Sequence, residues 1–248
     1  MLKNDIKYLS KLLQKKYRTS EGKFIVEGRR LIEEGIKSKF NCHSIYITEE
    51  FKDNFPEFTK LINNNKIPLT ILNKKDIEKI SSTESPQGIA AVFEIPKNEE
   101  KIYDENVVVC LDNISDPGNV GTILRTCAWF GIKAVLLSKD CAELYNPKVL
   151  RSSMGGVFNL NIFENVDLQI EIQSLKSLNY KIYLADMNGT DYRNVNFEKK
   201  TAIIFSSEAF GPTKEIANLS DIKITIPSKG NIESLNVSAA AAIILSKI

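Results

Sequence analysis

The sequence predicts an α/β protein with two domains, and three observations support this prediction. Short apolar runs typical of strands alternate with helical patterns along the chain. A polar, charged and proline-led stretch at 96–106 separates two series of such runs. The strands of the second series are almost continuously apolar, as parallel strands covered on both faces are. We therefore expect a small α/β domain over 1–96, a linker over 97–106 and a second, mostly parallel α/β domain over 107–248.

The first domain is expected to open with a helix over 4–16, because leucines recur on one face of that segment and lysines on the other. Strands are predicted at 23–28, 44–48, 68–72 and 88–96, and helices at 29–38, 56–64 and 74–81. Alternation of this kind predicts a small sheet flanked by helices.

The second domain has about 140 residues, a typical domain size. Strands are predicted at 107–113, 133–138, 181–187, 202–208 and 222–227, with helical segments between them. Because helices separate the strands, we expect crossover connections and a mostly parallel sheet.

The composition is that of an ordinary globular protein, with 43% apolar and 26% charged residues in 248. No apolar run approaches the roughly 20 residues of a membrane-spanning helix, and the first residues lack an apolar signal-peptide core. The four cysteines are scattered and form no Cys-x-x-Cys pair. These features predict a cytoplasmic protein with reduced cysteines, no membrane association and no structural metal.

The positive charge is concentrated near the start of the chain. Residues 1–40 have a net charge of +6 and the remainder sums to −4. A basic region of this kind is a weak indication of a polyanionic partner. A solvated helix face explains the same lysines, so the charge leaves both interpretations open.

A first group of polar residues follows the strand that ends at Asp112. A turn containing Asp-Pro-Gly leads to Asn119, where we expect the N-cap of a helix. Asn119, Thr122 and Arg125 then fall on one stripe of that helix. They would line the crevice at the carboxyl ends of the strands, where open α/β sheets bind ligands. A capped helix with a surface arginine explains this stretch equally well. The opposite, core-facing side would carry Ile123, Leu124, Cys127 and Phe130.

A second group follows the next buried strand, at 202–216. Glu208 comes at the strand end, and Gly211-Pro212 is expected to open a helix. The glycine would let the backbone come close to a ligand, and the carboxylate beside it would line the ligand site. A turn with a capping acid is the simpler interpretation of this stretch alone.

A third group lies in 226–242, where Glu233, Ser234 and Asn236 precede an alanine-rich helix that Ser238 begins. Small side chains in that helix let another backbone pack closely against it. A capping box before an ordinary buried helix is the alternative, but it does not explain the clustering of polar residues. Glycine-rich dinucleotide and nucleoside-triphosphate motifs are missing from the sequence, and so is any His or Cys nucleophile arrangement.

Together the three stretches resemble, in order and spacing, the three signature motifs of the SpoU/TrmH family of RNA 2′-O-ribose methyltransferases, in the SPOUT superfamily. Asn119 and Arg125 match the first motif. The stretch 206–211 matches the second, with Ser206 where the family has glycine; we expect the small serine to leave cofactor binding intact. Ile226, Pro227 and 233–238 match the third. The stretch 147–160 is similar to the family's Arg-x-Ser-x-Gly segment.

The resemblance covers 107–248 and implies a SPOUT methyltransferase domain with a trefoil knot, S-adenosylmethionine as cofactor and a homodimer. The motif-one helix and the alanine-rich helix are our candidates for the dimer contact. Residues 1–96 resemble the substrate (RNA)-binding domain of ribosomal-RNA members. The family motifs imply catalytic roles for Arg125, Asn119, Ser234, Asn236 and Glu208, and cofactor contacts at Ser206, Gly211, Ile226 and Leu235.

The implied reaction is methyl transfer to a ribose 2′-hydroxyl, with ribosomal RNA as our first choice of substrate. Arg125 would act either as general base or as a cation that stabilises the developing alkoxide. A guanidinium does not readily lose its proton, so the second role is electrostatically simpler. Transfer RNA as substrate, or an RNA-binding homologue that has lost catalysis, is the alternative. An oxidoreductase that binds a nucleotide cofactor lacks its glycine-rich fingerprint.

Overall fold

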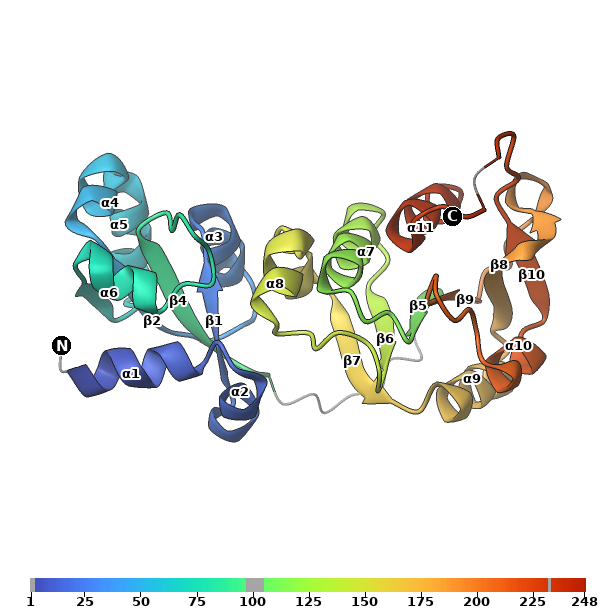
Figure 1. Ribbon diagram of the computed structural model, residues 1–248, viewed down its shortest axis with the longest axis horizontal. Helices are drawn as coiled ribbons and strands as arrows, with labels where there is room; N and C mark the ends of the chain where they lie inside the picture. Colours follow the sequence, from blue (N-terminus) through green and yellow to red (C-terminus); the bar gives the residue numbers. More distant parts are fainter. Residues whose placement is uncertain (1–2, 97–104, 232) are drawn as a thin grey trace. The chain divides into compact units, whose positions relative to one another are not determined.

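The computed structural model describes residues 3–96, 105–231 and 233–248 (Figure 1), so most of the predicted linker lies outside the described residues. The chain divides into two compact units. Unit 1 comprises Met1–Lys97 together with Tyr145–Phe158, and unit 2 comprises Asn98–Leu144 together with Asn159–Ile248. The units differ from the predicted domain ranges in the segment 145–158, which we had expected in the second domain. Its aromatic side chains pack inside unit 1, as described below.

Unit 1 is built on a mixed four-stranded sheet with the order β1-β4-β2-β3. Its strands are β1 (Lys23–Glu27), β2 (Cys42–Ile47), β3 (Leu69–Ile71) and β4 (Ile89–Glu94). Strand β4 is antiparallel to β1 and β2, whereas β2 and β3 are parallel. The helices are α1 (Lys3–Lys11), α2 (Lys15–Glu21), α3 (Arg29–Lys37), α4 (Glu49–Asn54), α5 (Pro56–Asn64), α6 (Lys74–Lys79) and α8 (Pro147–Ser153), followed by the 3₁₀ turn η1 (Gly156–Asn159).

The helix predicted over 4–16 is wrong in one respect, because the chain breaks into α1 and α2. At the break the backbone N–H of Leu12 bonds to the carbonyl of Leu9 at 3.0 Å, a tight turn in place of a helical bond. The buried Arg18 of α2 donates from Nη1 to the carbonyl of Leu12 at 2.9 Å. This hydrogen bond satisfies a carbonyl that the end of α1 leaves open. The short helix α4 was also missed.

The core of unit 1 has two faces. On one, Leu9 and Leu12 pack with Ile77 and Ile80 over the sheet. On the other, an aromatic cluster joins β1 and β4 to the segment 145–158, with Phe24 and Tyr145 ring centroids 4.4 Å apart. The cluster consists of Phe24, Phe40, Phe93, Tyr145 and Phe158.

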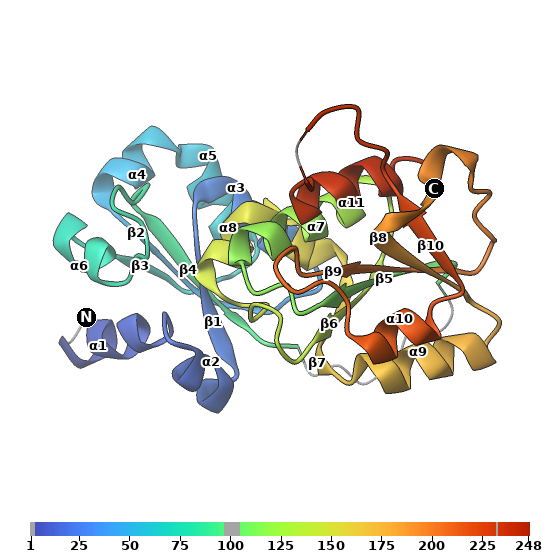
Figure 2. The same cartoon turned by 45° about the vertical axis from the view of Figure 1, so that its right-hand side comes forward.

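Unit 2 contains a fully parallel six-stranded sheet with the order β10-β8-β9-β5-β6-β7. Helices α7 and α11 lie on one face of this sheet, and α9 and α10 lie on the other (Figure 2). The strands are β5 (Val107–Asp112), β6 (Ala134–Ser138), β7 (Asn161–Val166), β8 (Lys181–Asp191), β9 (Thr201–Ser206) and β10 (Ile222–Thr225). The helices are α7 (Pro117–Trp129), α9 (Leu168–Ser177), α10 (Lys214–Leu219) and α11 (Val237–Leu245), and a 3₁₀ turn, η2, covers Tyr192–Asn194.

The predicted strands of unit 2 are confirmed, but β7 was missed. It is an edge strand with only one fully buried residue, Ile162, so it lacks the continuous apolar run of its neighbours. The helix expected to open at Gly211-Pro212 instead begins at Lys214 with Thr213 as its N-cap. Within the described ranges, no helix has both the length and the apolar character needed to cross a bilayer.

The strand order reverses between β5 and β9. From β5 the chain continues to β6 and β7 on one side, and its later strands β8 to β10 lie on the other. The carboxyl ends of β5 and β9 therefore flank a topological switch point, the usual ligand position in an open parallel sheet.

Candidate active site at the switch point

The ends of β5 and β9 are tied together at the switch point. Asp112 and Ser206, the last residues of the two strands, are register partners. The Ser207 N–H donates to the carbonyl of Asp112 at 3.0 Å, and the Ser206 hydroxyl donates to Asp112 Oδ2 at 3.4 Å. Burial raises the pKa of the Asp112 carboxyl, while hydrogen bonds from Ser206 and the Thr213 backbone act in the opposite direction. The serine that replaces the family glycine is thus buried and directed at Asp112.

Helix α7 starts three residues before the position that the sequence suggested. Asp116, not Asn119, is the N-cap, and its Oδ1 accepts from the Asn119 N–H at 2.8 Å. The signal for this cap was Asp116-Pro117, since proline favours the first helical position. With Asp116 as the cap, the Asn119 side chain is available for other contacts.

The exposed stripe of α7 agrees with the prediction along most of its length. Asn119 and Thr122 are half-buried and Arg125 is exposed, whereas Ile123, Leu124 and Cys127 are buried in the core. Phe130 was expected in the core, but 42% of its surface is exposed, because it lies at the C-cap where α7 ends. The Arg125 side chain has no hydrogen bond or ion pair with any other residue that the structure describes.

Asn236 connects the third motif to the first. It is the N-cap of α11, and its Oδ1 accepts from the N–H of Ser238 at 3.0 Å and from the Ser238 hydroxyl at 2.6 Å. Its Nδ2 donates to Asn119 Oδ1 at 2.9 Å. Both ends of the Asn236 amide are therefore used, and the orientation of Asn119 is coupled to the start of α11.

Glu208 connects the second motif to the third. Its Oε1 accepts from the backbone N–H of Val237, the first residue of α11, at 2.6 Å. A carboxylate at this position satisfies an open helix N–H and interacts favourably with the helix dipole. This contact joins the loop after β9 to the start of α11.

The remaining predicted site residues lie around these contacts. Ser234 and Leu235 are exposed in the loop before α11, and Ile226 directly follows β10. Gly211 has a left-handed backbone with φ of +64°, and the position a β-carbon would take has no atom within 4 Å. The structure thus joins Asn119 to Asn236 and Glu208 to the backbone of Val237 by hydrogen bonds. It leaves Ser234 and Arg125 open to solvent.

Most of the segment 147–160, including its Arg-x-Ser-x-Gly pattern, lies in unit 1. Arg151 Nη1 lies 4.0 Å from Glu27 Oε1 and donates to the Ser82 hydroxyl. The Glu27 carboxylate also accepts from the backbone N–H and the hydroxyl of Ser82, both at 2.7 Å. The Glu27 carboxylate is nearly buried, and these hydrogen-bond donors offset the cost of removing its charge from water. No local pattern in the sequence indicates that Glu27 and Arg151 lie side by side.

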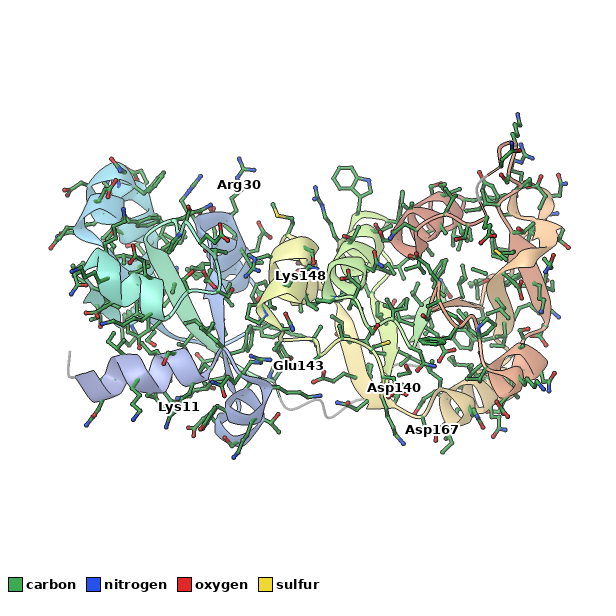
Figure 3. All side chains as sticks on the ribbon, in the orientation of Figure 1. Lys11, Arg30, Asp140, Glu143, Lys148 and Asp167 are labelled. Carbon is green, nitrogen blue, oxygen red and sulfur yellow. The ribbon has the colours of Figure 1, made fainter. Side chains whose placement is uncertain are left out.

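The basic residues of 1–40 do not form one surface. Figure 3 shows Lys11 on α1 and Arg30 on α3 at well-separated places in unit 1. Arg18 is buried, and Lys37 forms an ion pair with Glu33 at 2.7 Å. The charge excess of this region is therefore distributed. Among the described residues, no three His, Cys, Asp or Glu side chains gather as a metal site would require.

Two known family models match segments of this chain. The SpoU rRNA Methylase family model matches residues 106–246, and the MRM3-like substrate binding domain model matches residues 3–91. A 23S rRNA (guanosine(2553)-2′-O)-methyltransferase of Bacillus subtilis, RlmP, is 33% identical over 97% of this chain and 94% of its own length.

Two solved structures are similar to this chain over almost its whole length. A TrmH-family protein from Porphyromonas gingivalis has a TM-score of 0.87 at 30% identity and covers 100% of this chain and 97% of its own. The SpoU methyltransferase AviRb from Streptomyces viridochromogenes, solved with the cofactor AdoMet, has a TM-score of 0.88 at 21% identity, with coverage of 99% and 97%. At that identity the second likeness establishes the fold alone.

Proposed function

The chain belongs to the SpoU rRNA methylase family, and on this premise we propose that it transfers a methyl group from S-adenosylmethionine to a ribose 2′-hydroxyl of ribosomal RNA. One observation supports this assignment above the others. The three motif segments, far apart in the sequence, are joined at the switch point by the Asn236–Asn119 and Glu208–Val237 hydrogen bonds. Arg125 lies open to solvent two turns along α7 from Asn119.

The residues at the switch point fit S-adenosylmethionine. The Ser206 side chain, which replaces a glycine, is directed at Asp112 and adds no unpaired group. Gly211 leaves open space where a β-carbon would project. Leu235 is exposed, and its backbone makes no hydrogen bond with another residue of the described part of the chain. Ser206, Gly211, Ile226 and Leu235 are the residues that we propose to hold the cofactor.

The sulfonium of the cofactor supplies an activated methyl group, so the protein has to align the ribose and manage a poorly acidic hydroxyl. Arg125 is an exposed cation with no protein partner among the described residues, so it is free to bind RNA. A guanidinium keeps its proton, and it would stabilise the developing alkoxide and hold a neighbouring phosphate. Asn119, fixed by Asn236, and Ser234 would orient the ribose. Glu208 would act as a positioning residue, because its carboxylate is engaged with α11.

Ribosomal RNA is favoured over transfer RNA by the relatives. The Bacillus subtilis relative, similar over nearly its whole length, is named for 23S rRNA. Unit 1 contains the segment that matches a substrate-binding domain, which supports a role in holding a large folded RNA. Because ribosomal RNA is the proposed substrate, we place the protein in the cytoplasm with the ribosomes.

We further propose a homodimer that forms through α7 and α11. These two helices pack against each other on one face of the sheet. The end of α7 exposes Trp129, at 83% of its surface, beside Phe130. Exposed apolar side chains next to each other are typical of a contact surface. Light scattering should give twice the mass of the chain for the wild type and a smaller mass for Trp129→Glu.

A trefoil knot in unit 2 is also part of the proposal. It is supported by family membership and by the return of the chain from the edge strand β10 to α11, which packs on α7 near the centre of the sheet. A crystal structure tests this proposal. In a knotted chain, residues 206–248 thread through the preceding loops, and in an unknotted chain they pass outside them.

The direct test is transfer of tritiated methyl from S-adenosylmethionine to unmodified total RNA. We expect wild-type protein to label the large ribosomal RNA. Arg125→Ala should lose at least a hundredfold in rate, because an oriented charge at a reacting oxygen has that magnitude. Arg125→Lys is the matched variant, since it keeps the charge but loses the planar fork, and it should be intermediate.

Each result has a defined meaning. Label in transfer RNA would keep the chemistry and reject ribosomal RNA as the substrate. If folded wild type binds RNA but labels none, the chain is a binding homologue that has lost catalysis. Calorimetry with S-adenosylmethionine should give equal affinities for wild type and Arg125→Ala. A large loss in the variant would assign Arg125 to cofactor binding.

A further inference from the structure

The most exposed large apolar side chain in the described part of the chain is Phe210, with 87% of its surface open to solvent. It lies in the loop 207–213, which follows β9 at the switch point. An aromatic ring left in water forgoes the stabilisation that its burial would give. Single exposed apolar residues are common, so exposure alone assigns no role to Phe210. The surroundings of the ring are needed as well.

The loop that carries Phe210 is fixed at several points. Its first residue, Ser207, donates from its backbone N–H to the carbonyl of Asp112 at the end of β5. Glu208 holds the N–H of Val237 at the start of α11. The Gly211 N–H closes a turn onto the carbonyl of Ser207 at 2.8 Å, and the left-handed backbone of Gly211 reverses the chain. Phe210 is therefore presented outward from a tight turn, two residues beyond Glu208.

The neighbours of this turn belong to all three motif segments of the proposed RNA-modifying site. A ribose 2′-hydroxyl can reach such a site only if the nucleotide is accessible, and proteins hold exposed RNA bases by stacking them on aromatic rings. The other groups of the proposed site, Asn119 near the start of α7 and Arg125 further along that helix, are polar and suit the sugar and phosphate. Phe210 is the aromatic side chain in the loop 207–213.

From this setting, and on the premise of the proposed function, we infer that Phe210 is a platform on which a nucleobase of the substrate RNA stacks, at or beside the methylated nucleotide. Its role is to position the RNA strand, and it touches no reacting atom. The base is held by its π-face, so the platform accepts any base identity and contributes to RNA affinity rather than to sequence choice.

The test uses the full-length protein and an unmodified transcript of large-subunit ribosomal RNA. Phe210→Ala removes the ring, Phe210→Leu keeps apolar bulk without a π-face, and Phe210→Tyr keeps the ring. Ile170→Ala is the control, because Ile170 is 57% exposed on α9, on the face of the sheet opposite α7 and α11. We expect KM for RNA to rise roughly 5- to 150-fold in the Ala and Leu variants. The Tyr and control variants should stay within about twofold of wild type, with cofactor affinity and oligomeric mass unchanged throughout.

A Phe210→Leu variant that equals wild type would overturn the inference, since apolar bulk would then suffice. A Phe210→Ala variant that loses cofactor affinity or dimer mass would also overturn it and assign the ring to those contacts. If the wild type itself transfers no methyl, the proposed function fails, and a second measurement tests the stacking separately.

That second measurement is possible because the chain contains a single tryptophan, Trp129. In a Trp129→Phe, Phe210→Trp double variant, the new indole is the sole reporter. Stacking on a base should quench its fluorescence when RNA is added without cofactor. An unchanged signal at saturating RNA would reject the stacking.

Discussion

At the scale of single residues, Asn236 combines two functions that one substitution can separate. Its Oδ1 caps α11, and its Nδ2 orients Asn119. Asn236→Ser retains a good capping residue, so the free energy of unfolding should fall by less than about 0.5 kcal/mol. Methyl transfer should nevertheless drop about tenfold, because Asn119 loses its partner. Asn236→Ala removes both functions and should cost about 1 kcal/mol in addition to the activity.

Urea unfolding followed by fluorescence and the RNA methylation assay measure the two effects. A serine variant with full activity would mean that the Asn236–Asn119 hydrogen bond has no role in the reaction. Glu208→Gln gives a parallel comparison: a neutral acceptor should keep the Val237 bond and most of the activity.

The placement of polar residues near the ends of β5 and β9 could be predicted from the sequence, but the contacts between them could not, and their catalytic roles stay predictions. Asn119 and Asn236 lie at the starts of helices that follow apolar strands, and Arg125 lies further along the first of these helices, which is a local pattern. The bond between Asn236 and Asn119 joins residues 117 positions apart and depends on how α11 packs on α7. The cap at Asp116 was missed because Asn119 is an equally good capping residue by type.

At the scale of elements, the pairing of β8 with β10 supports the site indirectly. Lys223 pairs with Leu184 and Ile224 with Thr190, so residues 185–189 of β8 form an irregular stretch beside β10. Gly189 lies so close to β10 that an added β-carbon would be 2.6 Å from the carbonyl oxygen of Lys223. That contact is with backbone, which cannot move aside as a flexible side chain can.

We therefore expect Gly189→Ala to lower the free energy of unfolding by about 1–3 kcal/mol. Affinity for S-adenosylmethionine should also fall, because β10 leads directly to Ile226. Gly230→Ala is the control, since the position of its β-carbon is open. Thermal melting and calorimetry check the prediction. Equal melting temperatures for the two alanine variants would show that β10 can shift without cost.

Helices and strands could be predicted where the hydrophobic periodicity is strong. The edge strand of a sheet and a break within a helix were harder to predict. The buried strands β5 and β9 have unbroken apolar runs, whereas β7 mixes Asn, Glu and Val and was missed. The leucines of 4–16 fit one helix as well as two. At the break, the buried Arg18 donates to the carbonyl of Leu12, a contact that the leucine pattern does not indicate.

At the scale of the whole molecule, the segment 145–158 determines which parts of the chain fold together. Its Tyr145 and Phe158 complete the aromatic cluster around Phe24, and its Arg151 compensates Glu27. A fragment of residues 1–97 would leave that face of the sheet in water. We expect such a fragment to unfold without a sharp transition and to bind a hydrophobic dye.

Joining 145–158 to the fragment through a short glycine-serine linker should restore cooperative unfolding. Circular dichroism during heating measures this, with a linker ending in a scrambled 145–158 sequence as the control. A fragment of 1–97 that melts as sharply as the joined version would mean that the sheet and α3 suffice. No local pattern in the sequence links 145–158 to β1, so this arrangement had to come from the structure.

The placement of 145–158 also bears on how proteins of this design could be recombined. A chimera joined in the stretch 97–106 would take residues 1–97 of unit 1 from one parent and residues 145–158 of the same unit from the other. The aromatic cluster and the Glu27–Arg151 pair would then be assembled from side chains that were never selected together. Exchange of unit 1 between relatives therefore requires that residues 1–97 and 145–158 be transferred together.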